Sequence, residues 1–161
     1  MRIYWIEEID QGKVGIMPRP RGNDWLETEI RKLSMEQVTY VVSLLENQEI
    51  HELELEEEAS LCEKHGIGLI NFPIRDRSTP QDKEAFISLI ERLYQLVEKA
   101  NKIVIHCRMG IGRSSLVAAG IMVRAGIKAS GIFDLISKYR TLEVPDTATQ
   151  ISWFEEIQKS L

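Results

Sequence analysis

The segment from Ile103 to Val123 constrains the fold more than any other part of the chain. It begins with the apolar run Ile103-Val104-Ile105, continues through the glycine-containing stretch 106–115 (HCRMGIGRSS), and ends in the apolar run from Leu116 to Val123. The first run is typical of a buried strand, and the last is typical of a helix that is apolar nearly all round. A turn that joins a buried strand to a buried helix predicts an α/β fold.

The rest of the chain repeats this alternation of strands and helices. A hairpin is expected over residues 2–9 and 13–17, and further strands over 38–45, 67–72 and 103–106. Helices are expected after Asp24 and over 57–65, 81–102, 112–125, 130–140 and 147–160. Strands that alternate with helices predict a mostly parallel central sheet flanked by helices. Because ligands bind at the carboxyl ends of such strands, the position of Cys107 directly after one strand makes it a candidate site residue.

Composition narrows the class of protein. With 161 residues, of which 43% are apolar and 28% charged, the chain is expected to form a single domain over 1–161. A net charge of -5 argues against a nucleic-acid or membrane-surface partner. No apolar run approaches the roughly 20 residues of a spanning helix, and early acidic residues argue against a signal peptide. Only two cysteines, Cys62 and Cys107, are present, so a reducing cytoplasm is the expected location.

The turn after Cys107 has the chemistry of an anion site. The first N–H groups of the following helix lack intrahelical partners and carry partial positive charge. Gly110 and Gly112 allow positive φ angles or a close backbone approach, so successive N–H groups can form a nest. Arg113 adds a planar fork suited to two oxygens of a tetrahedral anion. Such surroundings also stabilise a thiolate, which predicts a lowered pKa and a nucleophilic role for Cys107.

The spacing of this stretch is His, Cys, five residues, Arg and Ser. It resembles the signature loop of the cysteine-dependent protein phosphatases, and in particular the small single-domain members of their dual-specificity branch. The resemblance covers most of residues 36–155 and implies no metal and no cofactor. It implies that Cys107 attacks phosphorus to form a phosphocysteine, and that the loop binds the phosphate through Arg108, Met109, Gly110, Ile111, Gly112 and Arg113. The alternative is a glycine turn that contains a core cysteine.

The same resemblance implies a proton donor upstream. The stretch 72–80 (FPIRDRSTP) is similar to the mobile acid loop of dual-specificity phosphatases, which makes Asp76 the candidate general acid. The alternatives for Asp76 are a solvated loop residue or a cap for the next helix. Ser114 is implied to hydrogen-bond the sulfur, and capping of the helix start is its alternative role. His106 is implied to orient the loop.

Other residues have weaker assignments. A Gln near the start of the C-terminal helix recurs in related phosphatases, which makes Gln150 a supporting candidate, but Thr147-x-x-Gln150 also fits a capping box, the favoured interpretation. Cys62 is expected in the core, and a disulfide with an oxidised Cys107 is the alternative. Surface arginines are candidates to line the mouth of the site: Arg19, Arg21, Arg75, Arg77 and Arg140.

The resemblance implies that the protein is a phosphomonoester hydrolase, namely a protein tyrosine or dual-specificity phosphatase. Its expected partner is a phosphorylated protein or a small phosphomonoester, and the protein itself is expected to be a monomer. An inositol-phosphate or phosphoinositide phosphatase is the first alternative, although such enzymes tend to carry lysines inside the loop, where this chain has only Arg108. A non-catalytic phospho-residue binding module is disfavoured because Cys107, Arg113 and Asp76 are all present.

Overall fold

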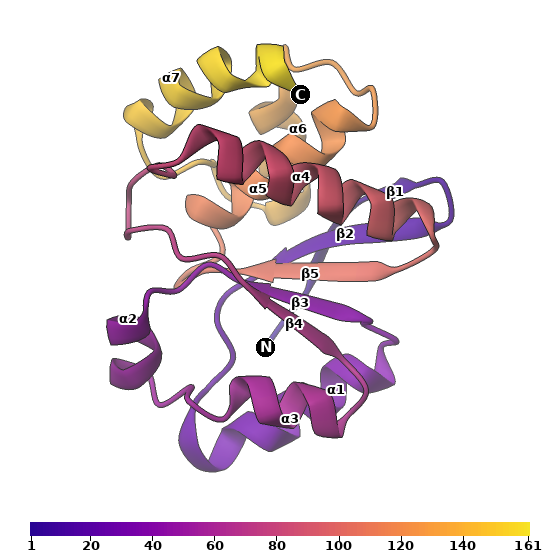
Figure 1. Ribbon diagram of the computed structural model, residues 1–161, viewed down its shortest axis with the longest axis vertical. Coiled ribbons are helices and arrows are strands. Elements are labelled where there is room, and N and C mark those ends of the chain that lie inside the picture. Colours follow the sequence, from indigo (N-terminus) through magenta and orange to yellow (C-terminus); the bar gives the residue numbers. More distant parts are fainter.

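One mixed sheet forms the centre of the molecule, in the strand order β1-β2-β5-β3-β4 (Figure 1). The computed structural model describes residues 1–161 apart from the side chain of Glu7. β1 and β2 are an antiparallel hairpin, and the other neighbouring strands pair in parallel. The predicted α/β class with a mostly parallel sheet is therefore confirmed. The strands are β1 (Tyr4–Ile9), β2 (Gly12–Met17), β3 (Tyr40–Ser43), β4 (Gly68–Asn71) and β5 (Lys102–His106).

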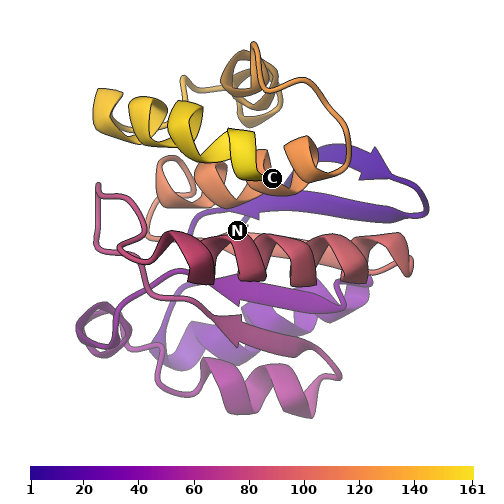
Figure 2. The ribbon, with the colours of Figure 1, turned by 45° about the horizontal axis from the view of Figure 1, so that its top comes forward.

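Helices cover both faces of this sheet (Figures 1 and 2). One face is covered by α1 (Leu26–Met35) and α3 (Glu58–Lys64), and the other by α4 (Lys83–Glu98), α5 (Arg113–Arg124), α6 (Ile132–Arg140) and α7 (Ala148–Ile157). The short helix α2 (Asn47–Glu52) follows β3, and 3-10 turns precede α1 (Asn23–Trp25) and follow α7 (Gln158–Ser160). No helix in the described part of the chain is both long and apolar enough to cross a membrane.

The central strand β5 has both faces buried because helices lie above and below it. Ile103, Ile105 and Cys107 pack into the apolar cluster that α4 and α5 share, whereas Val104 packs into the cluster around α1 and α3. Side chains alternate between the faces of a strand, so His106 is directed to the layer of α1 and α3 and Cys107 to the opposite layer. His106 and Cys107 are therefore adjacent in the chain but are surrounded by different helices.

The observed elements differ from the predicted ones mainly at their ends. Asp24 was expected to cap α1 but lies in the 3-10 turn before it. α4 ends at Glu98 rather than Lys102, because Ala100 adopts a φ of 66° and Lys102 already belongs to β5, where it pairs with Lys13 of β2. The helix α2 was not predicted, since six residues are too few for a periodic apolar pattern.

Candidate active site

The loop between β5 and α5 is shaped by its glycines and by an arginine behind it. Gly110 has a φ of 66°, and a side chain there would collide with the backbone of Met17. Arg140, which is buried, donates from Nε to the Gly110 carbonyl oxygen (2.9 Å) and from Nη2 to the Met109 carbonyl oxygen (3.1 Å). Because Arg140 binds these two carbonyl groups, the loop between Cys107 and the start of α5 is held in one conformation.

The thiol of Cys107 is buried and lies 3.5 Å from the hydroxyl oxygen of Ser114. Burial raises the pKa of a thiol. Here the Ser114 hydroxyl, the N–H groups of Ser114 and Ile111 and the charge of Arg113 outweigh that effect, so the pKa of Cys107 falls below its ordinary value. Within the described residues, Cys107 is the hydrogen-bond partner of the Ser114 hydroxyl, and no capping bond from this hydroxyl is present. The hydroxyl is therefore free to donate to the sulfur in the thiolate form.

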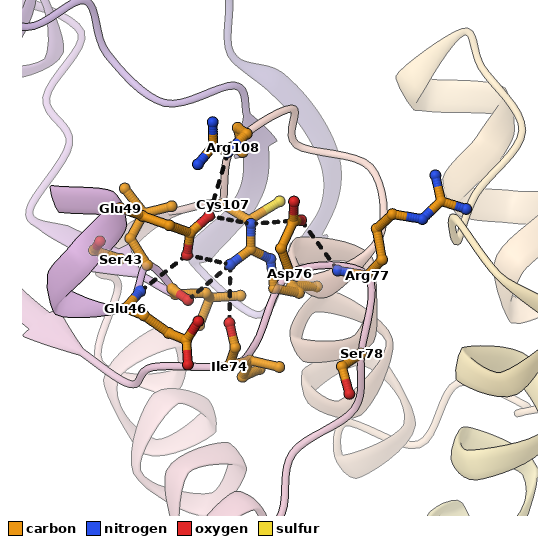
Figure 3. Close-up of polar contacts among 12 residues, drawn as sticks. Ser43, Glu46, Glu49, Ile74, Asp76, Arg77, Ser78, Cys107 and Arg108 are labelled. Carbon is orange, nitrogen blue, oxygen red and sulfur yellow. Dashed lines mark hydrogen bonds and ion pairs between the residues drawn. The ribbon is translucent and has the colours of Figure 1, made fainter. Parts of the chain in front are cut away.

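Arg113 is almost fully buried and is clamped by a carboxylate from α2. Its Nη1 donates to Glu49 Oε2 (2.8 Å) and its Nη2 donates to Glu49 Oε1 (3.0 Å), a bidentate ion pair. Nη1 also donates to the Ile74 carbonyl oxygen (2.9 Å), and Figure 3 shows these contacts converging on one guanidinium. The orientation of Arg113 is thus set before any anion binds.

Asp76 reaches the same guanidinium from the segment between β4 and α4. Its Oδ1 accepts from Arg113 Nη2 at 2.9 Å (Figure 3). The Asp76 side chain remains 49% exposed. Asp76 and Cys107 line one pocket of about 190 Å³. The structure therefore places two loops that lie about thirty residues apart in the chain against each other. The other residues of the pocket are Arg77, Arg108, Met109, Gly112, Arg113 and Asp146.

Gln150 joins the start of α7 to the segment that carries Asp76. The predicted capping box is confirmed, because Gln150 Oε1 accepts from the Thr147 N–H (3.1 Å) while Thr147 Oγ1 accepts from the Gln150 N–H (3.1 Å). In addition, Gln150 Nε2 donates to the Ser78 carbonyl oxygen at 3.0 Å. The buried side chain of Gln150 is therefore both a helix cap and a support for the loop around Asp76.

Of the five surface arginines expected to line the mouth of the site, the structure places only Arg77 at the pocket. Arg77 lines the pocket, although its side chain extends away from Cys107 (Figure 3). Arg140 lies behind the loop, and Arg21 pairs with Glu29 and stacks on Trp25. Arg19 donates to the neighbouring Pro20 carbonyl oxygen, and Arg75 is exposed. Arg108 of the loop pairs with Glu49 (3.3 Å) and Glu52 (3.6 Å), which reduces its charge toward the pocket.

Cys62 belongs to a different part of the core. It packs in the cluster of α1 and α3, on the face of the sheet opposite Cys107. Burial and the nearby charge of Glu58 raise the pKa of Cys62 to about 12, so this thiol stays protonated. This placement favours the core role of Cys62 over a disulfide with Cys107.

Sequence reasoning missed three acidic residues at or behind this site, namely Glu49, Glu58 and Asp146. Glu49 could have been suspected from the pattern Glu46-x-x-Glu49 after an apolar run, which forms a capping box in α2. Glu58 lies four residues before the buried Cys62, on the covered face of α3. Asp146 directly follows Pro145 and had no distinguishing signal.

Comparisons with known proteins identify a family of phosphatases that this chain resembles. A family model described as "Polymorphic toxin system, DSP-PTPase phosphatase" matches residues 14–127. A candidate tyrosine phosphatase of Invertebrate iridescent virus 3 is 45% identical over 53 residues, which cover 31% of this chain and 22% of that protein. A second, from Invertebrate iridescent virus 6, is 32% identical over 92 residues, 52% of this chain and 32% of that protein. The chain thus matches a third or less of the length of either relative.

Solved structures show the same fold at lower sequence identity. Kinase associated phosphatase, in a form whose catalytic cysteine is replaced by serine, superimposes with a TM-score of 0.90. The two chains are 20% identical, and the match covers 100% of this chain and 96% of that one. At this level of identity the likeness establishes the architecture alone.

Proposed function

This chain belongs to the DSP-PTPase phosphatase family, and on that premise we propose that it is a protein tyrosine or dual-specificity phosphatase that works through a phosphocysteine intermediate. The observation that carries the proposal is the shared pocket of Cys107, Arg113 and Asp76. A nucleophile with a lowered pKa, a buried guanidinium and an exposed carboxyl group are the groups that hydrolysis of a phosphomonoester requires.

In the first step the phosphoryl group of the substrate lies on the N–H groups of residues 108–113 and on Arg113. The arriving phosphate competes with Asp76 for the Nη2 edge of Arg113, where Asp76 now lies at 2.9 Å. The Cys107 thiolate attacks phosphorus as the bond from phosphorus to the leaving oxygen breaks. Asp76 in its protonated form donates its proton to that oxygen, so the alcohol or phenol leaves neutral.

In the second step water attacks the phosphocysteine. Asp76, now a carboxylate, accepts a proton from that water while the bond from sulfur to phosphorus breaks. The Ser114 hydroxyl donates to the departing sulfur, which stabilises it as a thiolate. Inorganic phosphate then leaves, and Cys107 and Asp76 are restored for the next cycle.

The surroundings of the pocket favour a phosphorylated protein over a multiply phosphorylated inositol as substrate. The one additional cation inside the loop, Arg108, is already paired with Glu49 and Glu52, which leaves little positive charge for a second phosphate. Met109 is exposed beside the pocket and provides an apolar surface for an aromatic ring. Both features suit a phosphotyrosyl side chain.

The remaining expectations are part of this proposal. Residues 1–161 act as a single phosphatase domain, monomeric and without a resident cofactor. The negative net charge of -5 supports a protein or small-molecule substrate rather than nucleic acid or a membrane surface. Two free cysteines, neither in a disulfide, support a reducing cytoplasm as the working location.

A substrate panel tests the proposal directly. Peptides with phosphotyrosine, phosphoserine or phosphothreonine are compared with inositol phosphates and nucleotides, and the Cys107→Ser protein is the control. We expect the highest kcat/KM on phosphotyrosine peptides and no turnover by the control. A preference for inositol phosphates would favour the phosphoinositide alternative. Failure on every substrate, with binding of inorganic phosphate intact, would favour a non-catalytic binding module.

A further inference from the structure

His106 lies on the face of β5 opposite to Cys107 and is held there by a carboxylate from α3. Its ring is fully buried, with Nε2 2.8 Å from Glu58 Oε1 and Nδ1 3.2 Å from the Cys107 carbonyl oxygen. Glu58 is also buried. The pair therefore links the layer of α1 and α3 to the first residue of the catalytic loop.

The neighbours of His106 leave Glu58 as the group that holds the ring. The residues beside it in the sheet are Met17 on β2 and Ser43 on β3. Ser43 Oγ is buried and makes no hydrogen bond within the described part of the molecule, so it does not bind the ring. Both ring nitrogens can act as donors only in the imidazolium form. A carboxylate at Nε2 and a carbonyl oxygen at Nδ1 match that form.

The charge of the pair agrees with this geometry. Burial lowers the pKa of a histidine, but the charge and hydrogen bond of Glu58 and the Cys107 carbonyl raise the pKa of His106 above its ordinary value. The Cys107 thiolate is a further cause of this increase. Because such coupling is reciprocal, the imidazolium also favours the thiolate. Glu58 lies at the far end of the ring from Cys107, so the positive end of the pair is directed to the catalytic loop.

We propose that Glu58 is a positioning residue for the reaction proposed above: acting through His106, it orients the start of the catalytic loop and stabilises the Cys107 thiolate. The expected effect on turnover rests on the proposed function, whereas the expected effect on the pKa of the Cys107 thiol does not. The other charged and polar groups that face Cys107 are Arg113 and Ser114 on α5 and Asp76 on the segment before α4. Glu58 hydrogen-bonds His106 and none of these groups, so a change at Glu58 leaves their contacts in place.

The test is the substitution Glu58→Gln, which keeps the shape of the side chain and an oxygen acceptor for Nε2 but removes the charge. Glu57→Gln is the matched control, because Glu57 is an exposed carboxylate one residue away. The readout is the rate of Cys107 alkylation by iodoacetamide as a function of pH, which needs no phosphatase turnover. We expect Glu58→Gln to raise the alkylation pKa of Cys107 by about one unit and Glu57→Gln to leave it unchanged.

A double-mutant cycle distinguishes an effect of Glu58 that acts through His106 from a general loss of packing. In a His106→Gln background, Glu58→Gln should cause no additional shift in the alkylation pKa. Glu58→Asp keeps the charge, but the side chain is one methylene group shorter and the carboxylate lies farther from His106. We expect this variant to shift the alkylation pKa of Cys107 by less than Glu58→Gln does. If Glu58→Gln does not fold, Glu58→Asp is used for the test instead. A folded Glu58 variant with the wild-type alkylation pKa overturns the proposal, as does a shift that persists without His106. Loss of phosphatase activity on every substrate, with the shift still present, would count against the proposed function alone.

Discussion

Four groups of the catalytic loop and the start of α5 lower the pKa of Cys107, in addition to the His106 imidazolium proposed above. Burial opposes a charged sulfur, and the Ser114 hydroxyl, two backbone N–H groups and Arg113 reverse that effect. Each group depends on the turn into α5, because a helix start supplies free N–H groups and the five-residue spacing returns the arginine to the nucleophile. The reactivity of this cysteine is therefore a property of its loop rather than of the thiol itself.

The pH dependence of activity follows from this lowered pKa. The thiolate is the reactive form, so we expect kcat/KM to be retained at mildly acidic pH and to fall only as the pH drops through the lowered pKa of Cys107. Ser114→Ala removes one donor to the sulfur, so we expect the acidic limb of the profile to move to higher pH. Breakdown of the phosphocysteine should also slow, which rapid-quench kinetics would record as a larger burst. An unmoved acidic limb would contradict the role assigned to Ser114.

The bidentate geometry of Arg113 leads to a second prediction at this scale. Lysine keeps the positive charge but cannot contact both oxygens of Glu49 and those of a phosphate together. We expect Arg113→Lys to weaken the binding of inorganic phosphate or vanadate by about tenfold or more. Isothermal titration calorimetry measures this affinity. Binding at the wild-type level would show that a point charge is sufficient and that the fork is unnecessary.

At the scale of elements, the site is assembled from three segments that follow strands. The catalytic loop follows β5, the segment with Asp76 follows β4, and α2 with Glu49 follows β3. Since these strands are parallel neighbours, their carboxyl ends meet at one edge of the sheet. Arg113, at the start of α5, contacts the segments that follow β3 and β4, so the guanidinium joins these elements as well as lining the pocket.

The segment with Asp76 can be tested separately from the loop. Asp76→Asn keeps a contact with Arg113 possible but cannot donate a proton to the leaving group. We expect turnover of an aryl phosphate to fall about 10²-fold and the basic limb of the pH–rate profile to disappear. A substrate with a more acidic leaving group should be affected less, because it departs without protonation. A profile that keeps its basic limb would mean that the proton donor lies elsewhere, and Asp146 is the other carboxylate of the pocket.

At the scale of the whole molecule, distant parts of the chain hold the site from outside. Arg140 of α6 binds the carbonyl groups of the catalytic loop, and Gln150 of α7 binds the Ser78 carbonyl oxygen near Asp76. The C-terminal helices therefore stabilise both loops although neither helix lines the pocket. Glu58 and Glu49 perform a similar role from the N-terminal half.

Gln150 allows this support to be separated from helix stability. Gln150→Ala removes both the capping box and the bond to Ser78, whereas Thr147→Ala weakens the cap and leaves the bond to Ser78 in place. We expect each change to lower the free energy of unfolding by about 1 kcal/mol. Only Gln150→Ala should also reduce kcat several-fold, because it frees the segment that carries Asp76. Equal kcat values for the two variants would limit Gln150 to a capping role.

The sequence by itself determined the class of fold and the identity of the central loop. Both are local: the period of apolar residues distinguishes strands from helices, and the cysteine-to-arginine spacing lies within one turn. The capping box at Gln150 is local in the same way. The approach of Asp76 to that loop followed from family resemblance, since nothing in the residues alone sets its distance from Cys107.

Only the tertiary structure decided which carboxylates hold the catalytic groups. Glu49 lies 64 residues from Arg113, and Glu58 lies 48 residues from His106. The pattern Glu46-x-x-Glu49 marks Glu49 as a helix cap but not as a partner of Arg113, and Glu58 has no comparable signal among the acidic residues of the stretch 46–58, most of which are exposed. A carboxylate becomes a buried partner only when strand order and helix packing bring a cation to it. The choice among these glutamates therefore depends on long-range contacts that no local pattern encodes.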